Sequence, residues 1–207
     1  MGDFPLVLLT ATIWTYWFTV GAMVYRIHRR TRKLVGVVPK QRLERYMWLV
    51  WVPLVGCWMA LPWLAMTRVN PPLALPAFAR EAPYATLRWI AALAAVACLL
   101  LTVQCWKRMG KDWRMDTAVG ERTQLITDGL WRRIRHPIYA FSILLMLSSA
   151  VIVPTGPMLA IAAVHVVLMN IKARNEERYL LQTHGEAYRS YVRTTGRFFP
   201  RLGGVSG

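Results

Sequence analysis

The stretch WRRIRHPIYAFSILLMLSSAVIVPTGP, residues 131–157, passes within a few positions from a cationic segment to an apolar one. Three arginines and a histidine precede Pro137, and no charged residue follows it in this stretch. Proline suits the first turn of a helix, because its missing N–H has no partner there. The closing PTGP predicts a tight turn between two helices. Residues 139–171 therefore indicate a helical hairpin whose first arm begins at a charged boundary.

Each arm of this hairpin is short for a membrane span. Residues 139–153 and 158–171 are apolar, but crossing a bilayer takes about 20 mostly apolar residues. We expect helical extensions at residues 133–139 and 172–177 to bring both arms to spanning length.

Three longer apolar segments precede the hairpin, at residues 4–25, 46–66 and 87–106. Backbone polar groups cannot remain unpaired in hydrocarbon, so segments of this kind cross the membrane as helices. A hydrophobic content of 56% also favours lipid over water as the surroundings. We expect an all-α integral membrane protein with five transmembrane helices, a cytosolic segment before the hairpin and a C-terminal amphipathic helix.

Lysine and arginine are distributed unevenly, and this distribution predicts the orientation of the chain. Of the 26 cations, 23 lie in residues 26–45, in residues 107–135 or after residue 171, which five spans place on one side. Short cytosolic loops are enriched in Lys and Arg, so we expect the N-terminus outside and the C-terminus in the cytoplasm. The net charge of +16 is then mainly a topology signal that also attracts anionic membrane lipids, and nucleic acid is not an expected partner.

The motif RHPIY, residues 135–139, has two explanations. In the simpler one, the arginine marks the cytosolic membrane boundary and Pro137 occupies the first turn of a helix. In the other, the helix N-terminus lies in a basic funnel and binds an anion, such as the carboxylate of an amino-acid-like cofactor. His136 would then contact that ligand.

A second polar cluster begins where the hairpin ends. Glu176 and Glu177 are either solvated charges, whose ion pairs with nearby arginines add little stability, or members of a pocket. Adjacent helical side chains point about 100 degrees apart, so we expect at most one of the two to face a pocket squarely. The three cysteines lie in apolar runs without the spacing of a metal site, and no metal is expected.

Together, these clusters resemble the isoprenylcysteine carboxyl methyltransferase and phospholipid methyltransferase superfamily of integral membrane enzymes. The resemblance rests on LITDGLWRRIRHPIYAF, residues 125–141, and on NEERYLLQTHGEAYRSYVRTTGRFFPRL, residues 175–202. MGKDWR, residues 109–114, is similar to a motif of many bacterial members, so a bacterial inner membrane is the expected location. The first two spans resemble only membrane helices in general.

The resemblance implies a cytosolic pocket for S-adenosyl-L-methionine, with S-adenosyl-L-homocysteine as product, and a tunnel that opens into the bilayer. We expect residues 1–106 to form three N-terminal spans with a basic loop, residues 107–202 the cofactor-binding methyltransferase core around the hairpin 139–171, and residues 203–207 a flexible tail. The implied cofactor contacts are Leu125, Gly129, His136, Pro137, Tyr139, Glu177 and Tyr188.

One residue departs from the family pattern. Phe141 stands where the family often has glycine, and its ring is expected to narrow the route by which a lipid substrate reaches the methyl group.

The motifs leave several methyl acceptors open. A carboxylate acceptor needs a cationic anchor such as Arg114, Arg135 or Arg174. An amine must instead lose a proton to a carboxylate such as Glu176 or Glu177, and a thiol acceptor also fits. The leading hypothesis is an enzyme of the isoprenylcysteine carboxyl O-methyltransferase type, acting on a lipid-like or prenylated small substrate that arrives from the bilayer. The alternatives are a phosphatidylethanolamine N-methyltransferase and a non-catalytic membrane assembly or signalling subunit, which only Phe141 favours.

Overall fold

The structure, a computed structural model, describes residues 2–32, 38–39, 41–68, 70–110, 113–116 and 125–201. Over these ranges it contains no strand, only an isolated parallel bridge between Ile134 and Gly196. In chain order the elements are α1 (Phe4–Thr31), α2 (Arg42–Thr67), the short 3-10 helix η1 (Ala77–Arg80), α3 (Tyr84–Met109), the 3-10 helix η3 (Gly129–Arg132), α4 (Pro137–Ile152) and α5 (Gly156–Thr194). The prediction of an all-α protein is confirmed.

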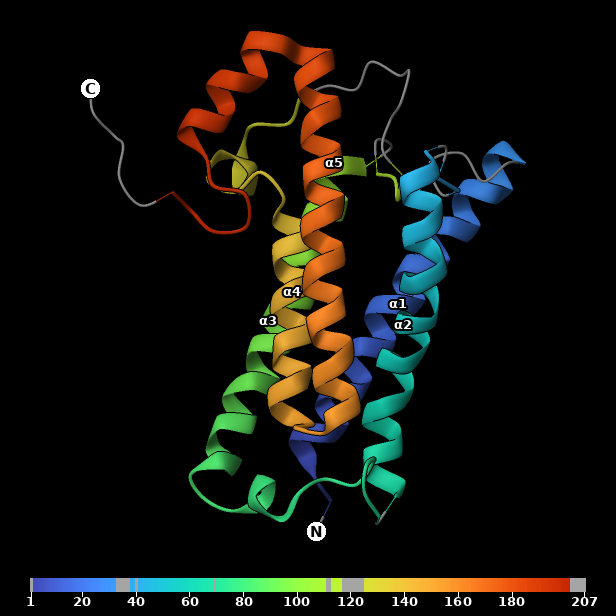
Figure 1. Ribbon diagram of the computed structural model, residues 1–207, viewed down its shortest axis with the longest axis vertical. Helices are drawn as coiled ribbons and strands as arrows, with labels where there is room; N and C mark the ends of the chain where they lie inside the picture. The colour runs from blue at the N-terminus through green and yellow to red at the C-terminus, as the bar shows by residue number, and fades with distance from the viewer. Residues whose placement is uncertain are drawn as a thin grey trace.

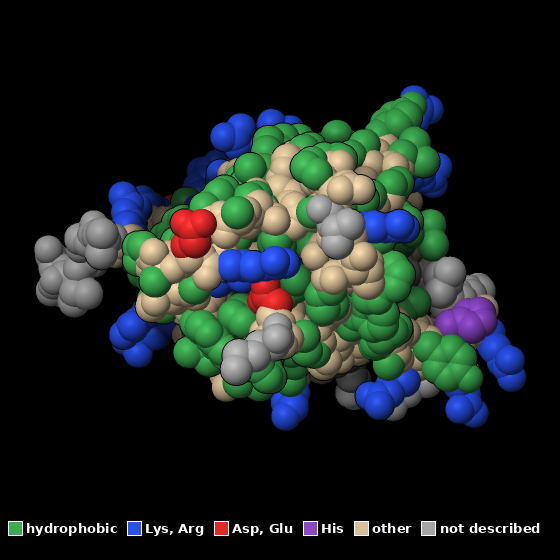
Figure 2. All heavy atoms as spheres, turned by 90° about the horizontal axis from the view of Figure 1, so that it is seen from below, with side chains coloured by type: hydrophobic (Ala, Val, Ile, Leu, Met, Phe, Trp, Pro, Cys, Tyr) green, Lys and Arg blue, Asp and Glu red, His purple; other side chains and the backbone are tan. Residues whose placement is uncertain are grey.

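The five α-helices form an elongated bundle, and the two termini lie at its opposite ends (Figure 1). The N-terminus shares its end with the α2–α3 and α4–α5 connections, whereas the α3–α4 connection and the C-terminus lie at the other end. Figure 2 views the N-terminal end, which is largely hydrophobic with a few charged side chains near its centre. This arrangement agrees with the prediction that the basic connections share one face.

Four helices, α1, α2, α3 and α5, are long and apolar enough to cross a membrane. The fifth, α4, has 16 residues and so a length of about 24 Å, which is short of the ~30 Å hydrocarbon core of a bilayer. Large apolar side chains such as Leu49, Leu93 and Val167 point outward from the bundle, as expected of helices in contact with lipid. The described helices are those of an integral membrane protein.

The predicted helical extension at residues 133–139 is wrong for its first four residues, because α4 begins at Pro137. The backbone before it pairs instead with the C-terminal segment. Arg135 N donates to Gly196 O over 2.8 Å, His136 N donates to Arg197 O over 3.1 Å, and Gly196 N donates to Arg133 O. These bonds compete with helix formation over residues 133–136.

The second arm is much longer than predicted, because α5 continues to Thr194. It bends at Gly185, whose φ of 54° lies in the left-handed region that glycine adopts at little cost. The expected amphipathic helix is therefore the part of α5 that follows this bend. Its tyrosines, Tyr188 and Tyr191, are buried against the rest of the protein.

A buried arginine of α3 fastens this helix to three other elements, α1, α4 and η1, at the N-terminal end of the bundle. Arg88 of α3 donates to both carboxylate oxygens of Asp3 over 2.7–2.8 Å, to Ile152 O at the end of α4 and to Ala79 O in η1. Asp3 also accepts from Leu6 N and so caps α1. The Arg88 side chain is 4% exposed, so a partner left behind after its removal would be unpaired and poorly hydrated.

We expect Arg88→Gln to lower the stability of the folded protein by about 3 kcal/mol, the cost of breaking a buried ion pair on one side. In a protein of this size this corresponds to roughly 6–12 °C in Tm, measured by thermal unfolding in detergent. Arg80→Gln is the matched control, because exposed Arg80 lies at the same end of the bundle. Equal Tm values for the two variants would contradict the fastening role.

Candidate functional site

Two cavities meet where α4 begins. The first, the polar cavity, lies between the start of α4, the middle of α5 and the segments before and after η3; it is lined by Met109, Trp113, Arg114, Asp116, Leu125, Ile126, Trp131, Arg135, His136, Pro137, Ile138, Tyr139, Glu176, Tyr179, Leu180, Tyr188 and Tyr191. Most of the cofactor residues predicted from the sequence are among them. The exceptions are Gly129 and Glu177.

His136 lies between the two adjacent glutamates of α5. Its Nδ1 is 3.5 Å from Glu176 Oε2, and its Nε2 is 3.4 Å from Glu177 Oε1. The imidazole stacks on the Tyr139 ring with 5.3 Å between centroids, and the Tyr139 hydroxyl donates to Glu176 Oε2 over 2.9 Å. Because neighbouring helical side chains diverge, only Glu176 lines the polar cavity, as the sequence predicted for one of the pair.

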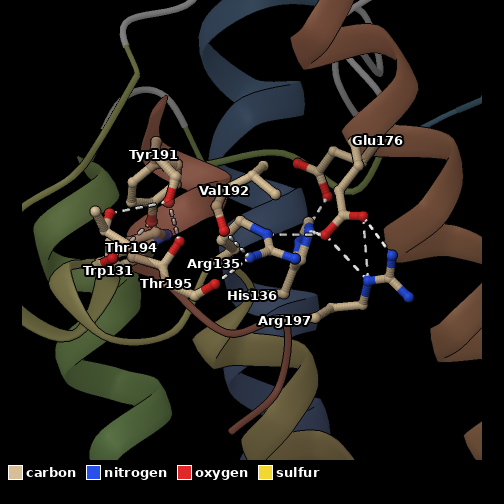
Figure 3. A network of polar contacts seen from close by, with 10 residues as sticks. Trp131, Arg135, His136, Glu176, Tyr191, Val192, Thr194, Thr195 and Arg197 are labelled. Carbon is tan, nitrogen blue, oxygen red and sulfur yellow. Dashed lines mark hydrogen bonds and ion pairs between the residues drawn. The ribbon is translucent and has the colours of Figure 1, made fainter. Parts of the chain in front are cut away.

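Glu177 does not line the polar cavity and pairs with two arginines, Arg135 and Arg197, which Figure 3 shows close to His136. Arg135 Nε donates to Glu177 Oε1 over 3.0 Å, and Arg197 Nη2 donates to Glu177 Oε2 over 2.6 Å. Arg135 Nη1 also donates to the carbonyl oxygens of Thr195 and Val192. The Arg135 guanidinium, predicted to anchor a substrate, thus already binds a carboxylate and the C-terminal backbone.

The charge of His136 follows from this arrangement. Burial by itself lowers the pKa of the imidazole, but the carboxylates of Glu176 and Glu177 outweigh burial and raise the pKa above its ordinary value. The two carboxylates thus favour the charged form of the imidazole.

Besides His136 Nε2, which lies beside the Glu177 carboxylate, two buried polar atoms at the polar cavity have no hydrogen-bond partner in the described part of the chain. They are the Tyr188 hydroxyl and Asp116 Oδ2, and both residues line the cavity. Buried polar groups are almost always paired, so these two atoms indicate a ligand with polar groups of its own. The cavity also offers an apolar wall, from Leu125, Ile126 and Leu180, that suits a flat heterocycle.

The second cavity, the apolar chamber, extends from the first toward the middle of the bundle. Its lining is mostly aromatic and aliphatic and consists of Tyr16, Trp17, Val20, Glu44, Met47, Trp48, Trp51, Trp106, Trp113, Arg114, Met115, Ile138, Tyr139, Ser142, Met169 and Lys172. Trp113, Arg114, Ile138 and Tyr139 line both cavities. About half of the chamber wall comes from α1 and α2, in which the sequence indicated no functional residue.

Two cations line the apolar chamber, and each is paired with a buried carboxylate. Lys172 Nζ lies 3.0 Å from Glu44 Oε1, and Arg114 Nε lies 2.9 Å from Asp116 Oδ1. Glu44 is 2% exposed and also accepts from Asn175. The sequence predicted Arg114 but missed Lys172 and Glu44, because 128 residues separate the two partners.

Three predicted residues lie elsewhere. Gly129 begins η3 with a φ of 58° and is exposed, and it lines neither cavity. Arg174 is exposed and also lines neither. Phe141 is 8% exposed and packs in the hydrophobic core, so it does not narrow the route to the site as expected.

Residues 87–187 match the family described as phospholipid methyltransferase. This segment belongs to the phospholipid methyltransferase family. The match confirms the resemblance drawn from the motifs and indicates a membrane methyltransferase, whose reaction requires a methyl donor. No curated protein matches the chain.

The methyltransferase-family segment contains α3, α4 and most of α5, and with them His136, Tyr139, Glu176 and Glu177. It includes neither α1 and α2, which complete the apolar chamber, nor Tyr188 and the C-terminal segment. Across the described ranges there is no group of three or more His, Cys, Asp or Glu side chains placed to hold a metal ion.

The charge state of His136 generates a pH prediction. Its pKa is raised on folding, so its contribution to stability is fully present below the unfolded-state pKa of about 6.5 and is lost as the pH rises through the folded-state value. We expect the Tm difference between the wild-type protein and His136→Gln to be largest at acidic pH and to shrink toward alkaline pH.

The measurement is a series of thermal unfolding curves in detergent, from acidic pH below about 6.5 to alkaline pH. His28→Gln serves as control, because His28 is exposed at the end of α1. A Tm difference for His136→Gln that stays constant with pH would show that the imidazole is not charged between the glutamates.

Proposed function

We propose that this protein is an S-adenosyl-L-methionine-dependent methyltransferase of the isoprenylcysteine carboxyl O-methyltransferase type. It transfers a methyl group to the carboxylate of a lipid-like or prenylated small substrate at the cytosolic face of a bacterial inner membrane. The observation that carries the proposal is the junction of the two cavities at Tyr139 and Arg114, because methyl transfer requires donor and acceptor sites that meet.

The polar cavity has the chemistry that this cofactor needs. The amino-acid end of the cofactor would lie near His136 and Tyr139, where the unpaired Tyr188 hydroxyl offers a further polar partner. The adenosine would lie against Leu125, Ile126 and Leu180. When bound, the cofactor supplies an electrophilic methyl group on a sulfonium.

In this reaction the residues of the chain mainly align the reacting atoms and exclude water, and acid–base chemistry plays a smaller part. In-line displacement needs the nucleophile, the methyl carbon and the sulfonium sulfur that leaves to be held in one line, in a site without water. Trp113 and Ile138 line both cavities and exclude water at their junction. The network of His136, Glu177, Arg135 and Arg197 keeps the cavity wall in place from behind.

The charges that line the apolar chamber favour a carboxylate as methyl acceptor. Lys172 lines the chamber, and Glu44 accepts one of the three N–H bonds of its ammonium group, so donors remain for an anionic oxygen. Arg114 adds a second cation at the junction. A carboxylate is already ionised at neutral pH and needs no base, only such an anchor.

The second candidate is a phospholipid N-methyltransferase. The description of the matching family and the carboxylate of Glu44 in the chamber wall support it, because an amine acceptor must lose a proton. The third alternative, a non-catalytic subunit, rested on Phe141 alone, and this residue packs in the core away from both cavities.

Cofactor binding tests both enzyme hypotheses. We expect the purified protein to bind S-adenosylhomocysteine, and His136→Ala and Glu177→Ala each to weaken this binding by about tenfold or more, since one removes a wall of the cavity and the other its support. Isothermal titration calorimetry measures the affinities. Glu186→Gln is the control, because Glu186 is an exposed carboxylate on the same helix.

Absence of binding to well-folded wild-type protein would rule out both enzyme hypotheses. Unchanged affinity in both alanine variants would instead refute the site assignment alone.

Lys172 distinguishes the acceptors. We expect Lys172→Met to reduce methyl transfer to a prenylcysteine analogue by about tenfold or more while S-adenosylhomocysteine affinity stays unchanged, because Lys172 lines the apolar chamber and not the polar cavity. The assay follows labelled methyl from S-adenosylmethionine into the analogue and, in parallel, into total membrane lipid. Lys107→Met, an exposed lysine at the end of α3, is the matched control.

Label that appears only in phosphatidylethanolamine derivatives would overturn the carboxylate assignment in favour of N-methylation. The fold and the cofactor site would be unaffected by that result.

A further inference from the structure

A basic hollow lies on the opposite side of Glu177 from the polar cavity. This hollow, the arginine basin, has a volume of about 700 Å³ and is lined by Arg174, Glu177, Arg178, Leu181, Glu186, Tyr188, Arg189, Val192, Arg193 and Arg197. None of its arginines lines the polar cavity or the apolar chamber. Tyr188 lines both the basin and the polar cavity and separates the two spaces.

The bend of α5 at Gly185 creates the basin. Before the bend, Arg174 and Arg178 lie four residues apart and so on one face of the helix. After the bend, the helix turns back beside its own first part (Figure 1) and brings Arg189 and Arg193 to the same hollow. Four arginines from two arms of one helix thus converge where an unbent helix would spread them along its axis.

The charge of the basin is not balanced by its own acids. Five arginines and two glutamates line it, which leaves a charge of +3. Glu186 pairs with Arg189 and Arg193, and Glu177 pairs with Arg197 and Arg135. Arg174 and Arg178 have no ion pair in the described part of the chain, and like charges at this spacing repel each other.

The position of the arginine basin and its apolar lining residues indicate which kind of anion balances its positive charge. The basin lies at the end of the bundle where α5 passes from the apolar residues 156–171 to the charged residues that begin at Lys172, a boundary at which lipid headgroups are expected. Leu181 and Val192 add apolar surface beside the arginines. A soluble anion uses only the charges, whereas a phospholipid uses both the charges and the apolar surface.

We propose that the arginine basin binds the phosphate of an anionic phospholipid from the adjacent leaflet. Guanidinium groups bind phosphate oxygens in pairs of charge-assisted hydrogen bonds, and Arg174 and Arg178 are free to do so. The lipid offsets the repulsion between these arginines and holds the two arms of α5 together. It is a structural partner at a site separate from the methyl acceptor.

The test measures lipid binding to the full-length protein in a neutral detergent. The probes are dioctanoyl phosphatidylglycerol, dioctanoyl phosphatidylcholine and inorganic phosphate, and native mass spectrometry counts the bound molecules during titration. We expect phosphatidylglycerol to bind about tenfold more tightly than either other probe, since only it combines net negative charge with acyl chains.

The double variant R174Q/R178Q is expected to lose about tenfold in phosphatidylglycerol affinity. The control R132Q/R133Q removes the same charge from exposed arginines at the same end of the bundle, outside the basin, and should change the affinity by less than about twofold. Equal losses in the two double variants, or no loss in R174Q/R178Q, would overturn the proposal.

The wild-type protein provides an independent test if the double variant does not fold. Equal affinity for phosphatidylglycerol and phosphatidylcholine, or for phosphatidylglycerol and inorganic phosphate, would show that the basin does not recognise an anionic lipid. These measurements require neither cofactor nor methyl transfer, so they stand apart from the outcome of the activity assays.

Discussion

The carboxylate of Glu177 is the interaction on which the functional end of the protein depends. It joins Arg135, which precedes α4, to Arg197, which follows α5, and it lies beside His136. The backbone bonds between residues 133–136 and 196–197 run parallel to this ion pair. The C-terminal segment also turns tightly on itself and leaves no room for a side chain at Gly196, where an added Cβ would lie 1.7 Å from Phe199 O. Residues 196–197 thus pack against residues 133–136 and hold one side of the site beside the start of α4.

This closure explains how a charged cluster is tolerated beside a membrane. Buried charges cost free energy unless they are paired and hydrogen-bonded, and here two glutamates meet a histidine, two arginines and a tyrosine hydroxyl. At the polar cavity, the Tyr188 hydroxyl and Asp116 Oδ2 have no hydrogen-bond partner in the described part of the chain. The paired charges of Glu177, Arg135 and Arg197 lie behind the cavity wall. These two unpaired polar atoms lie where a ligand would bind.

The division between the two cavities follows the division of the chain. The family segment supplies the residues around His136, whereas α1 and α2, outside that segment, supply much of the apolar chamber. Under the proposed function, the family segment would hold the cofactor, and α1 and α2 would help to select the acceptor. The pairing of Glu44 in α2 with Lys172 in α5 connects the halves at the point where the acceptor would be held.

The sequence by itself determined the helices, the hairpin and the separation of charge, because hydropathy, proline positions and the placement of Lys and Arg are local properties of the chain. It also indicated His136, Tyr139 and Glu176 through motifs that lie on either side of one turn. Only the tertiary structure decided that Arg135 binds the chain end, that Phe141 lies in the core, and that Lys172 and Glu44 form a pair. Those outcomes depend on contacts between residues far apart in sequence, and no local pattern specifies which distant side chains share a buried space.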